Sequence, residues 1–260
     1  MNSIEKDKVS VIMLVQDCGQ FLEASVKSIM AQTYQNWELI FVDDASMDNS
    51  IQRIMQLKGD DPRFKISQCV FSQGETVNRN SAIKDAQGKW IAFLDAGDIW
   101  EPTKLEKQVH FMEENDYAFT YTMFNNIDAQ GKDVGVMMTG PECITKDDMK
   151  KCCWMGYLTV MFDVEKIGRL QVKGMQYAND YSLWILVSEK ADCHLLPECL
   201  ASQMSEKGLW NRLWISDKWA WRYETYRRIE RLNPISAAFM AVRNLAYTAY
   251  KWWKYAKKMK

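Results

Sequence analysis

Acidic side chains recur at the ends of the apolar runs in this chain, where they could bind a cation or a ligand rich in hydrogen-bond donors. Asp17, Asp43, Asp44, Asp95 and Asp98 each follow such a run closely. Grouped carboxylates repel one another unless a cation or a donor lies among them. A single Asp after a strand is also a common turn or helix-capping residue. Several in succession favour a shared binding site.

The elements that must position these carboxylates alternate between strands and helices. Strands are predicted at residues 9–15, 37–42, 64–70 and 90–94, and the first is a continuous apolar run typical of a strand buried on both faces. Helices are predicted between them at residues 21–32, 51–57 and 76–86. This alternation predicts an α/β fold with a doubly wound, largely parallel sheet. Ligands bind such sheets beyond the carboxyl ends of the strands, where the Asp residues would converge.

The pattern changes after Pro102. A helix is predicted up to residue 114, and no second alternation of strands and helices follows. The remaining elements expected are hairpin strands around residues 117–124 with a turn at 128–131, a buried strand at 159–162, an apolar helix at 180–187 and a strand at 195–204. The second part of the chain therefore differs in architecture from the first.

Three blocks of residues then occur in a distinctive order. Residues 37–48 read WELIFVDDASMD, residues 78–108 contain NRN, GKW, FLDAGDIW and KLEKQ, and residues 179–184 read NDYSLW. This order resembles glycosyltransferase family 2, whose enzymes have a GT-A fold and move a sugar from a nucleotide diphosphate. The resemblance covers roughly residues 8–205. It implies a nucleotide-sugar-binding half at about 1–115 and an acceptor-binding half at 116–205.

The resemblance also implies residues that bind the nucleotide sugar. Asp44, supported by Asp43, would accept hydrogen bonds from the nucleoside base. Arg79 stands where the family places a cationic contact to the donor, which suits a permanently charged guanidinium. Asp95 would lie beside the bound donor. Gln16 occupies the position of a Tyr that can stack on the base in many relatives, so the identity of the nucleotide stays open.

A metal and a general base are implied in the same way. Asp95 and Asp98 stand in the motif that positions a divalent cation, Mn²⁺ or Mg²⁺, on the diphosphate, where it neutralises the charge of the leaving group. Asp180 falls where inverting members keep the base that takes a proton from the acceptor hydroxyl. Gly97 stands where many relatives have a metal-binding Asp, and Asn179 replaces a frequent Glu.

Alternatives to each role remain open. Asp180 could cap its helix, and Arg79 could be a solvated helix residue. A non-catalytic nucleotide-sugar-binding or scaffold protein of the same fold is the second interpretation, favoured by Gly97 and Gln16. Another nucleotide-dependent transferase on a Rossmann-like sheet would need a glycine-rich loop after the first strand, where Gly19 alone is found.

Charge is distributed unevenly along the chain. The net charge of −1 divides into −10 for residues 1–204 and +9 for residues 205–260, where 13 Lys and Arg meet 4 Asp and Glu. The basic segment also holds six of the 11 Trp. From residue 234 on, apolar residues recur at helical spacing: Ile235, Phe239, Val242, Ala246, Ala249 and Trp253, with Arg243, Lys251, Lys254 and Lys258 on another face.

Residues 206–260 are therefore predicted to form a basic, Trp-rich amphipathic helical region that binds an anionic membrane surface. Packing on the first domain or salt bridging to its acidic surface are alternatives, and nucleic acid is not expected as a partner because no RNA-binding motif occurs. The seven Cys, an odd number, favour a reducing compartment.

The whole pattern predicts an inverting, metal-dependent glycosyltransferase of cell-envelope polysaccharide or lipopolysaccharide synthesis. It would be cytoplasmic, peripheral at the inner face of the cell membrane, and would act on a saccharide acceptor that is lipid-linked.

Overall fold

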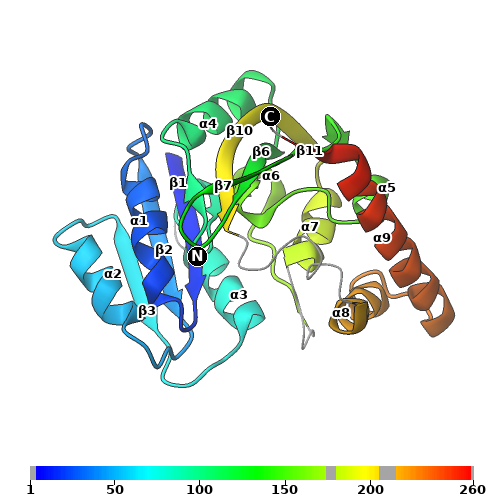
Figure 1. The fold of residues 1–260 in the computed structure, drawn as a ribbon, viewed down its shortest axis with the longest axis horizontal. Coiled ribbons are helices and arrows are strands. Elements are labelled where there is room, and N and C mark those ends of the chain that lie inside the picture. Colours follow the sequence, from blue (N-terminus) through cyan, green and yellow to red (C-terminus); the bar gives the residue numbers. More distant parts are fainter. Residues whose placement is uncertain (1–3, 174–179, 205–214, 259–260) are drawn as a thin grey trace.

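The N-terminal part of the chain forms the strands and helices that its apolar pattern predicts. The computed structural model describes residues 4–173, 180–204 and 215–258 (Figure 1). Every residue of β2 (Trp37–Asp43) is buried, as expected for a strand covered on both faces. The other elements are β1 (Glu5–Val15), η1 (Gly19–Phe21), α1 (Leu22–Met30), α2 (Ser50–Lys58), β3 (Phe64–Gln68), α3 (Glu75–Asp85) and β4 (Gly88–Phe93).

The following part adds shorter strands and helices to the same sheet. Its elements are β5 (Ile99–Trp100), α4 (Lys104–Glu114), β6 (Phe119–Ile127), β7 (Asp133–Met138), β8 (Cys143–Ile144), α5 (Lys146–Met149), η2 (Tyr157–Thr159), β9 (Met161–Asp163), α6 (Val164–Ile167), α7 (Asp180–Ser188) and β10 (Cys193–Met204). The strand expected at 159–162 begins only at Met161, because the preceding residues form the 3₁₀ turn η2.

One sheet runs through the molecule in the order β11-β7-β6-β9-β4-β1-β2-β3. β4, β1, β2 and β3 are parallel, whereas β9 pairs antiparallel with both β4 and β6. β10 lies beside β6 in parallel and also pairs with β5 and β8. The predicted α/β class is confirmed, and the predicted parallel pairing is found among β4, β1, β2 and β3, whereas most of the other strand pairs are antiparallel.

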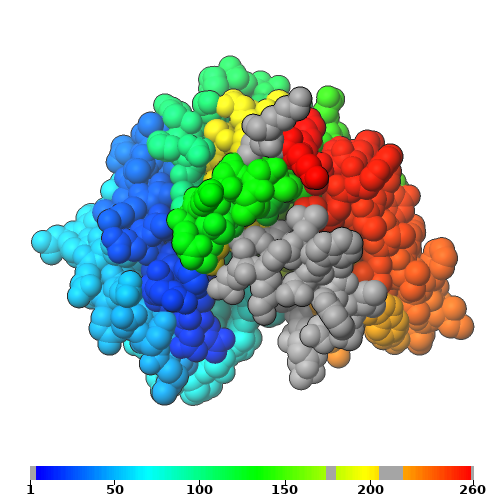
Figure 2. Space-filling view, viewed as in Figure 1, coloured from blue at the N-terminus to red at the C-terminus, as the bar shows by residue number. Residues whose placement is uncertain are grey.

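The C-terminal helices pack against the sheet-bearing part of the chain. They are α8 (Ile215–Arg228) and α9 (Pro234–Tyr255), and the chain then forms β11 (Ala256–Lys258), which pairs antiparallel with β7. Tyr226 of α8 and Ala237 and Ala241 of α9 belong to the same hydrophobic core as Ile12 of β1. Figure 2 shows β7 (green) meeting the C-terminal segment (red) on the surface.

This packing agrees with one of the alternatives for residues 206–260. The predicted boundary near residue 205 stays a prediction, and Trp210, Arg212 and Trp214 lie outside the described residues. The helix beginning at Pro234 is confirmed, and the side-chain oxygen of Asn233 caps it by accepting from the Ser236 N–H at 2.9 Å.

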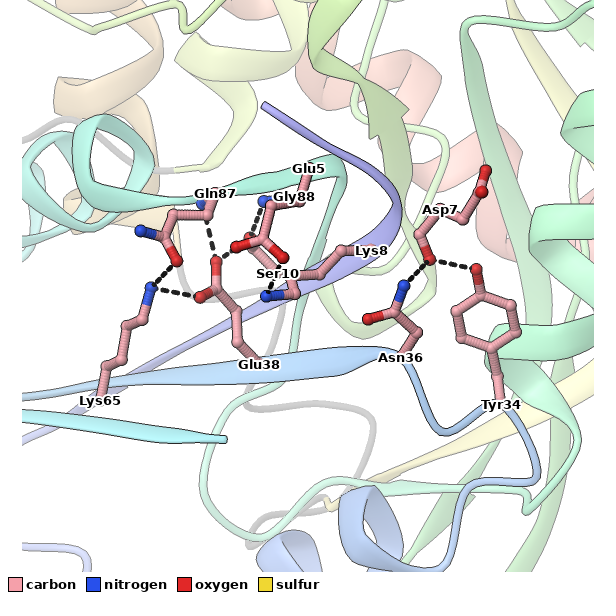
Figure 3. Close-up of polar contacts among 10 residues, drawn as sticks. All are labelled: Glu5, Asp7, Lys8, Ser10, Tyr34, Asn36, Glu38, Lys65, Gln87 and Gly88. Carbon is pink, nitrogen blue, oxygen red and sulfur yellow. Dashed lines mark hydrogen bonds and ion pairs between the residues drawn. The ribbon is translucent and has the colours of Figure 1, made fainter. Parts of the chain in front are cut away.

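A buried carboxylate holds the amino ends of the parallel strands together (Figure 3). Glu38 of β2, 2% exposed, accepts hydrogen bonds from the Ser10 hydroxyl at 2.5 Å and the Gln87 N–H at 2.7 Å, and it forms an ion pair with Lys65 of β3. The Ser10 hydroxyl also accepts from the Gly88 N–H at 2.8 Å. The carboxyl ends of the same strands lie away from this network and are available for a binding site.

Candidate active site

A pocket of about 340 Å³ opens at the carboxyl end of β4. Its walls come from α3, the segment after β4, η2, α7, β10 and α9. It is lined by Glu75, Arg79, Asp95, Phe124, Met138, Met155, Gly156, Tyr157, Asp180, Gln203, Lys251 and Trp252. Three residues singled out from the sequence, Arg79, Asp95 and Asp180, thus share one cavity. A larger pocket of about 460 Å³, between α1 and the β6–β7 turn, holds Gly97 but none of these three.

Asp95 follows β4 directly and opens into the pocket. The turn that carries it is fixed to α1, because the Gly97 N–H donates to the Ser25 hydroxyl at 2.8 Å. Asp95 is exposed to the pocket, yet the surrounding protein partly desolvates its carboxyl and raises its pKa above the usual value. The positive charge of Arg79 opposes this rise in pKa, whereas the negative charges of Glu75 and Asp180 add to it. A cation placed beside Asp95 would relieve this repulsion.

Asp98 faces a different neighbour from Asp95. Its side chain is 6% exposed, and its Oδ1 accepts a hydrogen bond from the Met204 N–H at 2.9 Å. Asp98 therefore ties the turn after β4 to the end of β10. Gly97 between them has φ of +99°, a conformation suited to glycine, and its Cα faces the Met204 side chain.

Arg79 of α3 is held at the wall of the pocket. It is 3% exposed, pairs with Glu75 one helical turn earlier, and its guanidinium carbon lies 5.2 Å from the Tyr157 ring centroid. Burial alone would lower the pKa of Arg79. The interactions with Tyr157, Glu75 and Asp180 together are stronger than this effect and raise the pKa. The guanidinium stays charged, and its Nε has no hydrogen-bond partner among the described residues. Arg79 is therefore not a solvated helix residue.

Asp180 is the first residue of α7, and the packing of α7 fixes where it points. The next residue, Tyr181, is 1% exposed and donates its hydroxyl to the Met149 carbonyl at 2.7 Å. The Ser182 hydroxyl lies 3.0 Å from that of Thr225 on α8. The neighbouring Asn179 lies outside the described residues.

Asp43 and Asp44 lie at the end of β2, apart from this pocket's lining. Asp44 is 7% exposed and accepts hydrogen bonds from Ser72 Oγ at 2.7 Å, Gln73 N–H at 2.7 Å and Gly74 N–H at 3.1 Å. Burial opposes the charge, but these donors outweigh it and lower the pKa of Asp44. Asp44 thus orders the loop before α3, and its contact with a nucleoside base stays a prediction.

Asp43 and Gln16 differ in their surroundings. Asp43 is fully buried and accepts from the Ser46 N–H at 3.1 Å, while its Oδ1 has no partner among the described residues. Gln16 is exposed at the end of β1. The adjacent Asp17 accepts from the Met47 N–H at 2.7 Å, which joins the loops after β1 and β2.

The structure adds pocket residues that the sequence reasoning missed. Glu75 and Tyr157 surround Arg79, and Lys251 and Trp252 enter from α9. The helical spacing puts Lys251 on one basic face with Lys254, but in the structure it is only 9% exposed and its Nζ donates to the Cys153 carbonyl at 2.9 Å. Only the Glu75–Arg79 spacing of four residues gave a signal in the sequence.

The donor set suits a metal held jointly with a substrate. Among the described residues, no three His, Cys, Asp or Glu side chains converge closely enough to hold a metal ion. Mg²⁺ and similar ions commonly use one or two carboxylates and take their other ligands from phosphates and water. Asp95, which lines the same pocket as the carboxylates of Glu75 and Asp180, fits that role.

Comparison with known proteins identifies the family. The sequence model of Glycosyl transferase family 2 matches residues 10–152. The chain is 34% identical over 241 residues to TuaG of Bacillus subtilis strain 168, a protein assigned as a teichuronic acid biosynthesis glycosyltransferase, covering 91% of this chain and 94% of TuaG. It is 36% identical over 182 residues, 69% of each chain, to the Escherichia coli UDP-Glc:alpha-D-GlcNAc-diphosphoundecaprenol beta-1,3-glucosyltransferase WfgD.

Solved structures share the fold. The crystal structure of S. aureus TarS residues 1–349 in complex with UDP-GlcNAc matches with a TM-score of 0.69 at 19% identity, covering 95% of this chain and 72% of that one. The mannosyltransferase PcManGT from Pyrobaculum calidifontis, in complex with GDP-Man and Mn²⁺, matches with a TM-score of 0.59 at 15% identity, covering 93% and 75%. The chain belongs to glycosyl transferase family 2 and is a glycosyltransferase with a GT-A fold.

Proposed function

We propose that this glycosyltransferase moves a sugar, with inversion, from a nucleotide diphosphate sugar to a lipid-linked saccharide in cell-envelope polysaccharide or lipopolysaccharide synthesis. The observation that carries the proposal is the sharing of one pocket by Asp95, Arg79 and Asp180. The named relatives support the substrate class, since WfgD acts on a diphosphoundecaprenol-linked sugar and TuaG is assigned to teichuronic acid synthesis.

Each pocket residue has a role in this proposal. Asp180 takes the proton from the acceptor hydroxyl as that oxygen attacks the anomeric carbon. Arg79, fixed by Glu75 and kept charged, donates to the donor diphosphate in a planar fork. Asp43, Asp44 and Gln16 belong to the nucleoside side, where Asp44 acts by ordering the loop at residues 72–74.

A divalent cation, Mn²⁺ or Mg²⁺, completes the proposed site and would supply charge neutralisation for the leaving diphosphate. Asp95 opens into the pocket and would be a direct ligand. Asp98, held by the Met204 N–H, would keep the turn that presents Asp95 in place. In a thermal-shift screen of nucleotide diphosphate sugars, Mn²⁺ should increase the stabilisation given by the true donor. Asp95→Asn should abolish this increase.

Transfer and donor hydrolysis by wild type, Asp180→Asn and Asp147→Asn test the catalytic role. Asp147 is exposed on α5, outside the pocket lining, so it serves as the control. Asp180→Asn should lower the turnover number by about 10²–10⁴-fold, because the acceptor loses its base. Equal, near-zero rates for all three proteins with Mn²⁺ present would contradict catalysis and favour a nucleotide-sugar-binding role.

We further propose that α9 attaches the enzyme to the inner face of the cell membrane. One face of the helix is solvent-exposed and apolar, with Ile235 85%, Phe239 67%, Val242 59% and Trp253 81% exposed. Exposed Lys254, Lys257 and Lys258 follow at its end and suit anionic headgroups. None of the described helices has the length and apolar character needed to cross a bilayer.

Flotation with vesicles of phosphatidylglycerol and phosphatidylcholine tests this attachment. Phe239→Ser with Trp253→Ser should reduce binding, whereas Met55→Ser, which alters an exposed apolar residue on α2 far from α9, should not (Figure 1). Point substitutions are preferable to truncation because β11 pairs with β7. Unchanged flotation of the double variant would refute the attachment.

A further inference from the structure

Lys251 is a buried cation that the proposed catalytic roles do not use. It is 9% exposed and lies on the inner side of α9, where it lines the same pocket as Asp95 and Asp180. Among the ion pairs of the described residues, none includes Lys251. An ammonium removed from water without a carboxylate partner carries a desolvation cost. That cost is offset when an anion enters the pocket.

The Lys251 ammonium is held in place with donor capacity to spare. Among the residues that the structure describes, its Nζ donates one hydrogen bond, to the Cys153 carbonyl at 2.9 Å, and an ammonium has three N–H groups. A neutral carbonyl satisfies one donor without cancelling the charge. The remaining N–H groups suit the oxygens of a phosphate.

The position of Lys251 relative to Asp180 is fixed by a polar joint between three helices. Asn244 of α9 donates to the hydroxyls of Tyr181 at 3.1 Å and Tyr226 at 3.0 Å. Its Oδ1 accepts from the Arg222 Nε at 2.6 Å. This joint links α9 to α7, which begins with Asp180, and to α8. The cation of α9 and the carboxylate of α7 are therefore held in one rigid unit.

This unit lies away from the loops that the proposed function assigns to the nucleoside. Those are the loops after β1 and β2 and the loop at residues 72–74, and α9 lies at the opposite flank of the molecule (Figure 1). A phosphate reaching Lys251 from the acceptor would approach along α9, whose outer face is exposed and apolar.

We propose that Lys251 is a binding residue for the phosphate of a phosphate-linked acceptor. This role rests on the proposed transfer to a lipid-linked saccharide, in which Lys251 recognises the phosphate that joins the saccharide to the lipid. Lys251 acts in binding: it contacts the phosphate and leaves the proton transfer to Asp180. In the proposed function the donor diphosphate is bound by Arg79 and by the cation that Asp95 would hold.

Calorimetric titration with geranyl diphosphate, a short isoprenoid diphosphate, tests the inference without requiring transfer. The titration is done with a saturating amount of the nucleoside diphosphate that most stabilises the protein, so that the donor's own phosphate positions are filled. Lys251→Met should weaken binding of geranyl diphosphate by about 10- to 100-fold, the effect of one charge-assisted hydrogen bond. Lys251→Arg should restore most of the affinity.

Lys190→Met is the control, because Lys190 is exposed just after α7, outside the pocket lining and away from the proposed membrane-binding face of α9. It should bind geranyl diphosphate like wild type. Melting temperatures are measured for all variants, since Lys251→Met also leaves the Cys153 carbonyl unpaired. Equal affinity of wild type and Lys251→Met overturns the inference, as does a loss confined to the nucleoside diphosphate. Loss of transfer in Asp180→Asn bears only on the catalytic proposal.

Discussion

A Cβ atom on Gly97 would lie 2.3 Å from Cε and 2.9 Å from Sδ of Met204, so the end of β10 closes directly over the turn after β4. Together with the φ of +99°, this contact accounts for a glycine at the position where many relatives carry an acidic residue. A side chain here would point at Met204, on the side of the larger pocket that both residues line. The Met204 contact and the positive φ thus account for glycine at position 97.

Substitution of Gly97 should cost both backbone strain and the displacement of Met204. Gly97→Ala should lower the free energy of unfolding by about 2–4 kcal/mol. Gly131→Ala is the control, because Gly131 also has positive φ, +79°, but nothing lies within 4 Å of its added Cβ. Urea denaturation of both variants should give the larger loss for Gly97→Ala. A loss no greater than that of Gly131→Ala would show that Met204 yields without cost.

Asp44→Asn should loosen the loop at residues 72–74. Oδ1 of Asp44 accepts from Gln73, and Oδ2 accepts from Ser72 and Gly74. In the variant one of these oxygens becomes an amide nitrogen that cannot accept, so amide hydrogen exchange at Gln73 or Gly74 should become faster. The KM for the donor should rise, because the proposed function assigns this loop to the nucleoside of the donor.

The control for Asp44→Asn is Asp128→Asn. Asp128 accepts from two backbone N–H groups in the β6–β7 turn and so performs the same loop-ordering task away from β2. Its replacement should leave the donor KM unchanged. The assignment of Asp44 to the donor side is wrong if both variants change KM alike.

Lys104 should make stability depend on alkaline pH. It is fully buried, its Nζ has no hydrogen-bond partner among the described residues and lies 4.0 Å from the Trp100 ring centroid, and burial lowers its pKa to about 7. The unfolded chain keeps this proton up to a pH of about 10.4. Between the folded-state pKa of about 7 and the unfolded-state pKa of about 10.4, unfolding therefore takes up a proton. The free energy of unfolding rises with pH over this range.

Lys104→Met should remove this dependence and stabilise the protein more at pH 6 than at pH 9. Lys107→Met, which changes an exposed lysine on the same helix, is the control. Denaturation curves at both pH values measure the difference. An equal effect of Lys104→Met at pH 6 and pH 9 would mean that Lys104 does not titrate with folding.

Glu38 should make stability depend on pH in the acid range, where the free energy of unfolding again rises with pH. Burial works against its charge, but Lys65, Ser10 and the Gln87 N–H outweigh burial and lower its pKa. A lowered pKa contributes stability above about pH 4.3, and this stability is lost as the pH falls through the folded-state pKa. Glu38→Gln should destabilise the protein at pH 7 by about 1–3 kcal/mol and by less at pH 3.

Glu23→Gln is the control for Glu38→Gln. Glu23 pairs with Lys27 on the surface of α1, where both side chains are more than half exposed. Solvent screens such a pair, so the variant should resemble wild type at both pH values. A pH-independent loss in Glu38→Gln would indicate that its shape, rather than its charge, holds the strands.

The strands and helices up to α4 could be predicted because their signal is local. A run such as residues 37–42 contains its own pattern, and burial of all of β2 follows from it. The direction in which a side chain points after the end of a strand depends on residues far away in the sequence. Asp95 opens into the pocket while Asp98 turns to Met204, a residue more than a hundred positions later, so spacing alone could not separate them.

The same limit applies to α9. Periodicity located its apolar face correctly but could not say what covers it, and in the structure Phe239 and Trp253 are exposed while Lys251 is buried. The side of α9 that faces inward carries Asn244, which forms hydrogen bonds with Tyr181 of α7 and with Arg222 and Tyr226 of α8. Those contacts exist only after the chain has folded, which is why Lys251 escaped the sequence pattern.

The pairing of β11 with β7 has a consequence for synthesis of the chain. Ribosomes add about 5–20 residues per second, so β7 emerges several seconds before residues 256–258. During that interval the outer edge of β7 lacks its partner strand, and an open strand edge is a template for pairing with other chains. A chain that ends before residue 256 keeps this edge open permanently and is prone to aggregate.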